Sequence, residues 1–219
     1  MLNVPDTRLA LQAYDRILGM IMSGEARPGD LVNERQLGQA LHMSRTPVRD
    51  ALLMLEREGL LVRQGMRGLQ IKQMRIEDFM NALQIRLLLE PEAARIAAGR
   101  VAAEARAEIE SRLRALLAQA ENGGRSVDRE EVRGVDNRLH GLIAEASGNE
   151  QMAAIIRTLR RQTQIFDLKS LPERLHDTCR EHLAIVDALG VPDGAKAAEA
   201  MKAHLEQVRQ SIITRLARM

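Results

Sequence analysis

The spacing of hydrophobic residues in the first third of the chain predicts a helix-turn-helix followed by a β-hairpin. A first helix is indicated by apolar side chains that recur every three or four positions, at Ala10, Ala13, Tyr14, Ile17, Leu18 and Ile21. Two further helices are expected to begin after Asn33 and Ser44, because both residue types cap helix N-termini well. Two short apolar segments, 60–64 and 69–73, are separated by a turn with Gly at both ends and predict the hairpin.

The rest of the chain predicts long helices separated by short stretches rich in Gly, Pro and Asn. Six helical segments are expected, at residues 77–99, 103–122, 127–147, 149–169, 173–189 and 194–217. The pattern changes near residue 75. We therefore predict a mainly α fold with two domains, a winged helix-turn-helix in residues 1–75 and an all-α helical bundle in residues 76–219.

Composition supports a helical protein with an aliphatic core. The chain has 219 residues with two Phe, one Tyr, no Trp and one cysteine, Cys179. So few aromatic rings favour helices over a large β-structure, and they argue against RNA binding by base stacking. No apolar run is long enough to span a bilayer, and no signal peptide is recognisable. Because a lone cysteine cannot form an internal disulfide, we expect a cytoplasmic protein without a membrane partner.

The charge is distributed unevenly between the two predicted domains. The whole chain has a net charge of +2, which by itself argues weakly against a nucleic-acid partner. Residues 1–75 contain eleven Lys and Arg against eight Asp and Glu, a net charge of +3. Residues 76–219 contain 21 against 22, a net charge of −1. The basic excess thus lies in the domain that is predicted to contain the helix-turn-helix.

The third predicted helix carries side chains suited to DNA. Arg45 and Arg49 are four residues apart, so they share one face near the N-terminus of the helix. This end of a recognition helix enters the major groove, where arginine matches the edge of guanine. The hydroxyls of Ser44 and Thr46 suit phosphates.

Other arginines flank this helix. Arg35, at the start of the second helix, is placed for a phosphate, and Arg67 with Gly68 at the tip of the hairpin could enter the minor groove. Each arginine alone is more often a solvated surface charge. The combination of two capped helices, a short turn and an arginine-tipped hairpin favours a DNA-binding domain.

Four segments resemble the N-terminal domain of GntR-family bacterial transcriptional regulators: PGDLVNERQL at 28–37, SRTPVRDAL at 44–52, EGLLV at 58–62 and RG at 67–68. The resemblance extends over about residues 7–73. It implies that Arg35, Arg45, Arg49 and Gly68 contact the operator and that Ser44 and Thr46 bind phosphate. It also implies a homodimer that binds palindromic double-stranded DNA.

Polar residues on three of the later helices are predicted to point into the bundle. Asp136 and His140 are four residues apart on a helix face that they share with apolar residues, and His182 and His204 are in phase with apolar residues of their own helices. Buried carboxylates and imidazoles are costly unless they are paired or bound to a metal, and this donor set suits Zn, Ni, Mn or Co. An ordinary pair of satisfied polar residues is the alternative.

The same positions resemble the FCD effector domain of the FadR subfamily of GntR regulators. The motifs are Asp136-x3-His140, Ser147-Gly148-Asn149, Glu181-His182 and Met201-x2-His204, within about residues 77–215. The resemblance implies that Asp136, His140, His182 and His204 bind a divalent metal ion, whose open coordination sites a small carboxylate effector occupies. Arg86, four residues before Glu90, is a candidate either for the effector carboxylate or for helix–helix pairing.

The sequence therefore predicts a ligand-responsive transcriptional regulator, a repressor more than an activator, and not an enzyme. Two alternatives stay open. One is a metal-dependent enzyme fused to a DNA-binding module, although no general base is evident beside the predicted ligands. The other is a DNA-binding protein that senses no ligand and in which the metal only stabilises the fold.

Overall fold

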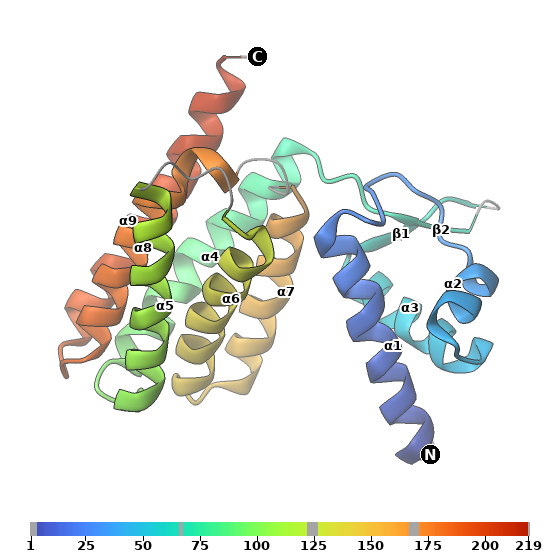
Figure 1. Ribbon diagram of the computed structural model, residues 1–219, viewed down its shortest axis with the longest axis horizontal. Helices are drawn as coiled ribbons and strands as arrows, with labels where there is room; N and C mark the ends of the chain where they lie inside the picture. The colour runs from blue at the N-terminus through green and yellow to red at the C-terminus, as the bar shows by residue number, and fades with distance from the viewer. Residues whose placement is uncertain (1–3, 66–67, 122–126, 167–170, 219) are drawn as a thin grey trace. The chain divides into compact units, whose positions relative to one another are not determined.

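The computed structural model describes residues 4–65, 68–121, 127–166 and 171–218. Figure 1 shows that the described chain is mainly helical with a small antiparallel sheet, which confirms the predicted fold class. The chain forms two compact units. The first unit consists of residues 1–79 and 161–168, and the second unit of residues 80–160 and 169–219. Among the described residues, no helix has the length and apolar character needed to cross a membrane.

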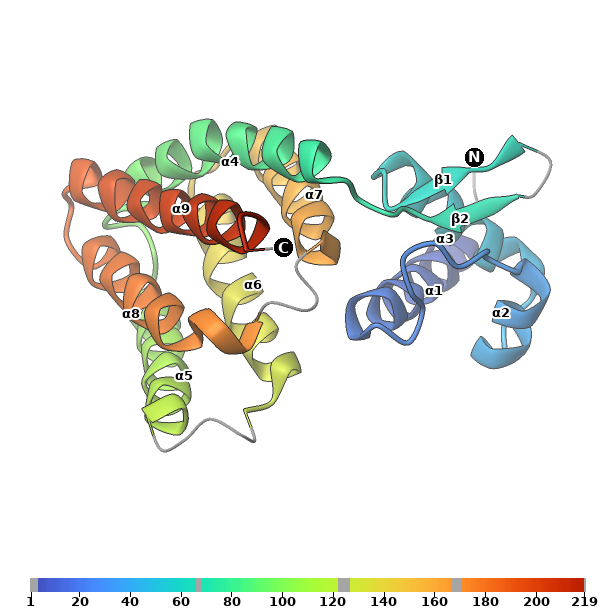
Figure 2. The same ribbon diagram turned by 90° about the horizontal axis from the view of Figure 1, so that it is seen from above.

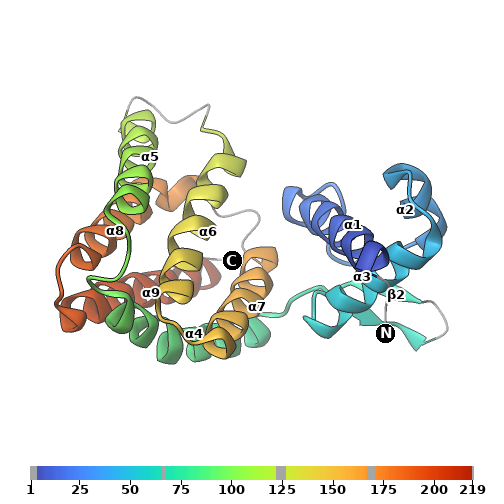
Figure 3. The same ribbon diagram turned by 90° about the horizontal axis from the view of Figure 1, so that it is seen from below.

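The first unit combines helices with a two-stranded sheet. Its elements are α1 (Val4–Ser23), α2 (Glu34–Leu41), α3 (Arg45–Arg57), β1 (Leu61–Arg63) and β2 (Leu69–Ile71). Helices α1 and α3 lie side by side, as Figure 3 shows, and supply most of the core. The stripe predicted for α1 is buried at Ala10, Ala13, Tyr14, Ile17 and Ile21. The amphipathic pattern therefore identified the buried face of this helix.

The two predicted helix starts behave differently. Asn33 Oδ1 accepts hydrogen bonds from the backbone N–H groups of Arg35 and Gln36, at 3.0 and 3.1 Å, so the predicted cap of α2 is confirmed. Ser44 lies at the N-cap position of α3, so the predicted helix start is confirmed, but its side chain makes no capping hydrogen bond. Because Ser44 is exposed, water can satisfy the first N–H groups of α3 instead.

The turn between α2 and α3 is tight. His42 adopts a left-handed φ of 54°, and the N–H of Met43 donates to the carbonyl of Gly38 at 2.9 Å. A Cβ atom on Gly38 would lie 3.0 Å from the carbonyl oxygen of Met43. A larger residue would therefore crowd the backbone where the turn closes against α2.

The hairpin is shorter than predicted. Strands β1 and β2 pair antiparallel, but they contain three residues each, whereas the apolar pattern predicts strands over 60–64 and 69–73. The N–H of Gln64 donates to the carbonyl of Gly68 at 2.8 Å, and Gly68 has a φ of 93°, which favours glycine. Arg67, which was predicted to contact DNA, lies outside the described residues.

The second unit contains long helices. They are α4 (Ile76–Ala97), α5 (Ala103–Glu121), α6 (Arg129–Ala146), α7 (Glu150–Phe166), α8 (Leu171–Leu189) and α9 (Gly194–Leu216). In Figure 2, α8 lies between α5 and α9, and it packs against both. The first turn of α4 and the last turns of α7 belong to the first unit, so each of these two helices has residues in both units.

The interior of the second unit is aliphatic except for a group of charged and polar side chains. Six ionisable members of this group are no more than 6% exposed: Arg86, Glu90, His140, Arg160, His182 and His204. Buried charges are rarely tolerated unless each has a partner. This buried group is therefore the candidate functional site of the second unit.

Candidate nucleic-acid interface and metal centre

The exposed face of α3 offers hydrogen-bond donors for DNA. The opposite face packs into the core of the first unit through Pro47, Val48, Ala51, Leu52 and Leu55. Arg45, Thr46 and Arg49 are exposed on the first turns of α3. In helix-turn-helix proteins this part of the recognition helix contacts base edges in the major groove.

Arg49 forms an ion pair that the sequence pattern did not indicate. Its Nη2 lies 3.1 Å from Glu34 Oε2, and its Nε lies 3.4 Å from Glu34 Oε1. The hydrogen bonds and the charge of Glu34 raise the pKa of Arg49. Because the two side chains are 64% and 35% exposed, the pair contributes little stability, and a base or a phosphate can replace Glu34.

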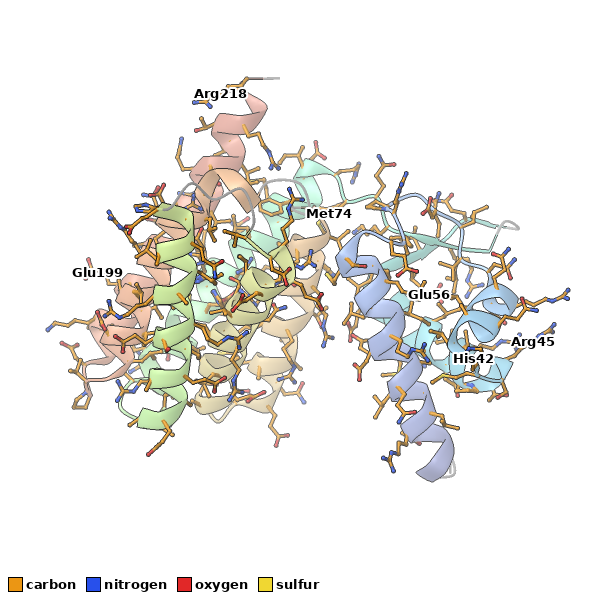
Figure 4. All side chains as sticks on the ribbon, viewed as in Figure 1. His42, Arg45, Glu56, Met74, Glu199 and Arg218 are labelled. Atoms are coloured by element: carbon orange, nitrogen blue, oxygen red, sulfur yellow. The ribbon has the colours of Figure 1, made fainter. Side chains whose placement is uncertain are left out.

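A hollow of about 550 Å³ lies at the turn between α2 and α3. It is lined by Arg35, Gly38, Gln39, His42, Met43, Ser44 and Arg45. Figure 4 labels Arg45, whose side chain extends away from the ribbon. The hollow thus brings together two arginines and the hydroxyl of Ser44, a set of donors that suits a phosphate.

Three histidines from three helices meet inside the second unit. His140 on α6, His182 on α8 and His204 on α9 are at most 3% exposed, and one ring nitrogen of each lies within 4.8 Å of the others. His182 Nε2 and His204 Nε2 are 3.4 Å apart. Asp136 Oδ1 lies 3.7 Å from His140 Nε2 and 3.5 Å from His182 Nε2. The structure therefore brings together the four residues that were predicted as metal ligands.

Three of these distances, 3.4, 3.5 and 3.7 Å, approach those between ligands of one divalent transition ion, so a small inward movement of the side chains would let them share an ion. Ligand atoms that are each about 2.1 Å from an ion lie roughly 3–3.5 Å from one another. His140 Nε2 is buried and has no hydrogen-bond partner among the described residues. A buried nitrogen without a partner is costly, and coordination would satisfy it. Imidazole nitrogens with one carboxylate form a donor set that suits Zn, Ni, Mn or Co.

Carboxylates orient two of the imidazoles. Glu90 on α4 contacts His140 Nδ1, and Glu181 Oε2 on α8 lies 2.8 Å from His204 Nδ1. When Nδ1–H donates to a carboxylate, Nε2 keeps its lone pair for a ligand. Such carboxylate–histidine pairs are common around metal ions in proteins.

Arginines hold both carboxylates in place. Arg86 Nε lies 2.6 Å from Glu90 Oε1, and Arg174 Nη2 lies 2.5 Å from Glu181 Oε1. Burial alone raises the pKa of Glu90, but the positive charge of Arg86 and the hydrogen bond from His140 outweigh this effect, so the pKa lies well below its ordinary value. Glu90 is therefore ionised, and it accepts hydrogen bonds from both neighbours.

Arg160 on α7 contacts Asp136 on the opposite side of the cluster. Burial alone raises the pKa of Asp136, but the positive charge of Arg160 outweighs it and holds the pKa well below its ordinary value. Burial lowers the pKa of His140, and it lowers the pKa of His182 and His204 further. The site thus combines an ionised carboxylate with neutral imidazoles near pH 7, the protonation states that metal binding requires.

Sequence reasoning missed several members of this network. Arg86 was singled out, and its partner Glu90 lies on the same helix at a spacing of four residues, a local signal for pairing. The contact between Arg160 and Asp136 joins two helices, and no local spacing indicates it. Arg174 holds Glu181, and Glu181 in turn contacts His204. The second contact depends on how α8 packs against α9, so the sequence did not indicate that Arg174 belongs to the network.

Known protein families match both the N-terminal and the C-terminal part of the chain. The family described as bacterial regulatory proteins, gntR family, matches residues 9–71, and the FCD domain matches residues 81–207. The chain is 31% identical over 215 residues to the HTH-type transcriptional regulator LutR of Bacillus subtilis (strain 168), a match that covers 86% of this chain and 94% of LutR. It is 30% identical over 200 residues to the probable D-xylose utilization operon transcriptional repressor of Paenarthrobacter nicotinovorans, with 91% and 86% covered.

A solved structure has the same fold. E. coli McbR/YncC superposes with a TM-score of 0.76 at 22% identity, covering 100% of this chain and 99% of that chain. The matching families consist of transcriptional regulators and not of enzymes, so the alternative of a metal-dependent enzyme is set aside. The chain belongs to the GntR family of bacterial transcriptional regulators and has an FCD domain after its helix-turn-helix.

Proposed function

We propose that this regulator represses transcription by binding a palindromic operator as a homodimer, and that a small carboxylate bound in the FCD domain changes its affinity for DNA. The observation that carries the proposal is the buried cluster of His140, His182 and His204, in a chain that also presents an exposed recognition helix. The name of one relative, a probable transcriptional repressor, supports repression. We expect the protein to act in the cytoplasm.

The DNA contacts follow from the exposed donors of the first unit. We assign Arg45 and Arg49 to bases, Arg35, Ser44 and Thr46 to phosphates, and Arg67 and Gly68 to the minor groove. A homodimer presents two copies of α3 to half-sites about one helical turn apart. In this proposal the DNA-binding domain comprises residues 1–75 and the effector domain residues 76–219.

The metal centre is assigned to Asp136, His140, His182 and His204. The bound ion, which we propose to be Zn, Ni, Mn or Co, supplies a Lewis-acid site for an effector carboxylate. The chain adds positive charge around this site through Arg86 and through Arg160. Arg86 is our candidate for direct contact with the effector, whose carboxylate would compete with Glu90 for the guanidinium group.

The path from effector to operator runs through shared helices. Arg160 on α7 contacts Asp136, so a carboxylate that competes for this guanidinium changes how α7 is held against α6. Helix α7 continues beyond Arg160 into residues of the first unit, and α4, which carries Arg86 and Glu90, begins there. A small displacement of either helix therefore acts on both units, which is the coupling that an allosteric regulator needs.

The test is an operator-binding measurement with matched forms of the full-length protein. A high-affinity site is first selected from random double-stranded DNA, and its dissociation constant is measured with zinc-loaded protein, metal-stripped protein and the His140→Ala variant. A panel of small mono- and dicarboxylates is then added to each form. We expect a palindromic site, dimers in sedimentation, and a carboxylate that changes affinity only for the metal-loaded protein.

Two outcomes would contradict the proposal. Operator affinity that no carboxylate changes at saturation would instead favour a regulator whose metal only stabilises the fold. Full retention of metal by His140→Ala, measured by elemental analysis, would exclude the four-residue site.

A further inference from the structure

Polar residues on α8, on α9 and just after the end of α9 line a groove of about 730 Å³. Every side chain that lines it is polar or charged, and six of them are Arg174, Asp177, Gln207, Ser211, Arg215 and Arg218. Arg218 follows the end of α9 and is labelled in Figure 4.

The charge of the groove favours an anion. The lining contains three guanidinium groups and the carboxylate of Asp177, and with Glu181, which pairs with Arg174, the net charge is +1 (three against two). Each guanidinium can donate two parallel hydrogen bonds to a carboxylate or a phosphate. The amides and hydroxyls of the lining supply further donors and acceptors for the rest of a ligand, so the groove combines charge recognition with neutral polar contacts.

Helix spacing relates the lining of the groove to Glu181 and His204. Arg174 and Asp177 precede Glu181 by seven and four residues, so all three lie on one face of α8, and Gln207 and Ser211 follow His204 on one face of α9. His204 Nε2 lies 3.4 Å from His182 Nε2, whereas its Nδ1 is directed at Glu181. Helix spacing therefore places lining residues in line with Glu181 and His204, whereas none of the three clustered histidines lines the groove.

We infer that this groove is a second ligand site, which binds a small anion, a carboxylate or a phosphate, through Arg174, Arg215 and Arg218. Binding here needs no metal. Arg174 also holds Glu181, so an anion that attracts Arg174 weakens the contact that orients His204. This last consequence rests on the proposed metal centre, whereas the site itself does not.

The test uses the full-length protein after removal of metal, because a carboxylate at the proposed metal centre then has no ion to bind. Succinate and inorganic phosphate are titrated separately by calorimetry, which distinguishes the two ligand sources. We expect at least one of them to bind, and the double variant Arg215→Gln with Arg218→Gln to bind it about tenfold or more weakly. Arg209→Gln on α9 and Arg180→Gln on α8 are matched controls, since both residues are exposed and lie outside the groove.

Each outcome decides the inference. No heat of binding from either probe at roughly 10 mM would overturn it, as would equal binding by the wild type and the double variant. Circular dichroism of the variants shows that they are folded. The inference and the proposed metal centre can fail separately. Negligible zinc affinity of the wild type would contradict the metal centre, whereas anion binding by the metal-stripped protein that depends on Arg215 and Arg218 would still support the groove.

Discussion

Glu181 Oε2 lies 2.8 Å from His204 Nδ1, so that a carboxylate on α8 orients an imidazole on α9. We expect Glu181→Gln to weaken zinc binding about tenfold, because the amide oxygen still accepts a hydrogen bond but without the negative charge that makes His204 a better ligand. Competition with a chromogenic chelator measures this affinity. Glu110→Gln is the control, since Glu110 also pairs with an arginine but on the surface of α5. Equal zinc affinity in the two variants would show that Glu181 does not support the metal centre.

Two glutamates of α4 allow a comparison of buried and exposed ion pairs. Glu90 pairs with Arg86 at 2% and 7% side-chain exposure, whereas Glu92 pairs with Arg95 at 47% and 54%. We expect Glu90→Gln to lower the free energy of unfolding by about 3 kcal/mol, because it leaves a buried guanidinium without its counter-charge. Glu92→Gln should change it by less than about 0.5 kcal/mol. Urea unfolding of both variants makes the comparison, and similar losses would contradict it.

Two helical glycines are expected to respond to alanine with opposite signs. A Cβ on Gly38 would meet the carbonyl oxygen of Met43 at 3.0 Å, whereas a Cβ on Gly141 has no atom within 4 Å. Gly38→Ala should destabilise the protein by about 1–3 kcal/mol, because the turn between α2 and α3 must open. Gly141→Ala should stabilise α6 by up to about 1 kcal/mol. Thermal unfolding distinguishes the two signs, and a neutral Gly38→Ala would exclude the close approach.

Arg49 and Arg35 are expected to affect DNA binding in different ways. If Arg49 leaves Glu34 to contact a base, Arg49→Ala should weaken operator binding by about 1–3 kcal/mol and relax selectivity at one base pair. If Arg35 holds a phosphate, Arg35→Ala should weaken all sequences alike and lower the salt dependence by about one ion. Binding is measured with single-base operator variants at several salt concentrations. Small and equal losses for both variants would remove the proposed docking arrangement.

The buried imidazoles predict how the stability of metal-stripped protein depends on pH. The pKa of His182 and of His204 lies well below the ordinary value of 6.5 in the folded state, because of burial and neighbouring charge. In the unfolded chain both return to about 6.5, so the unfolded state takes up protons first as the pH falls. Stability is therefore complete above about pH 6.5 and is lost below it, by up to about 1.4 kcal/mol per pH unit for each histidine.

Denaturant unfolding between about pH 7.5 and 5.5 measures this dependence. The double variant His182→Gln with His204→Gln should show a shallower decline, because these two groups no longer titrate. A wild-type stability that is constant over this range would contradict neutral burial of the imidazoles.

Regular helices made much of this protein predictable from sequence. The phase of His140, His182 and His204 relative to apolar neighbours was sufficient to direct all three inward, because a helix fixes side-chain direction within one turn. The charged partners behind them were harder to predict. Arg160 and Asp136 meet across two helices, and Glu34 reaches Arg49 from another helix fifteen residues earlier, so both contacts depend on tertiary packing.

Short-range chemistry also had limits. Asn33 caps α2 as predicted, whereas Ser44 occupies the same kind of position on α3 without forming the bond. The residue type therefore predicted where the helix begins but not where its hydroxyl points. The sheet was predicted too long because pairing at its ends is incomplete: Leu60 is buried and its carbonyl accepts a hydrogen bond from the N–H of Lys72 at 2.9 Å, but regular pairing begins only at Leu61.

The first unit is discontinuous along the chain, and this has a consequence for how such regulators can be cut or recombined. Ile165, near the end of α7, belongs to the hydrophobic core that contains Tyr14 and Leu55. A fragment ending at residue 79 would lack this side chain and expose the apolar surface that it covers. A chimera that joins the DNA-binding part of one relative to the effector domain of another at a single crossover would take the residue at position 165 from the wrong parent. We therefore expect this residue and the core that it completes to evolve together.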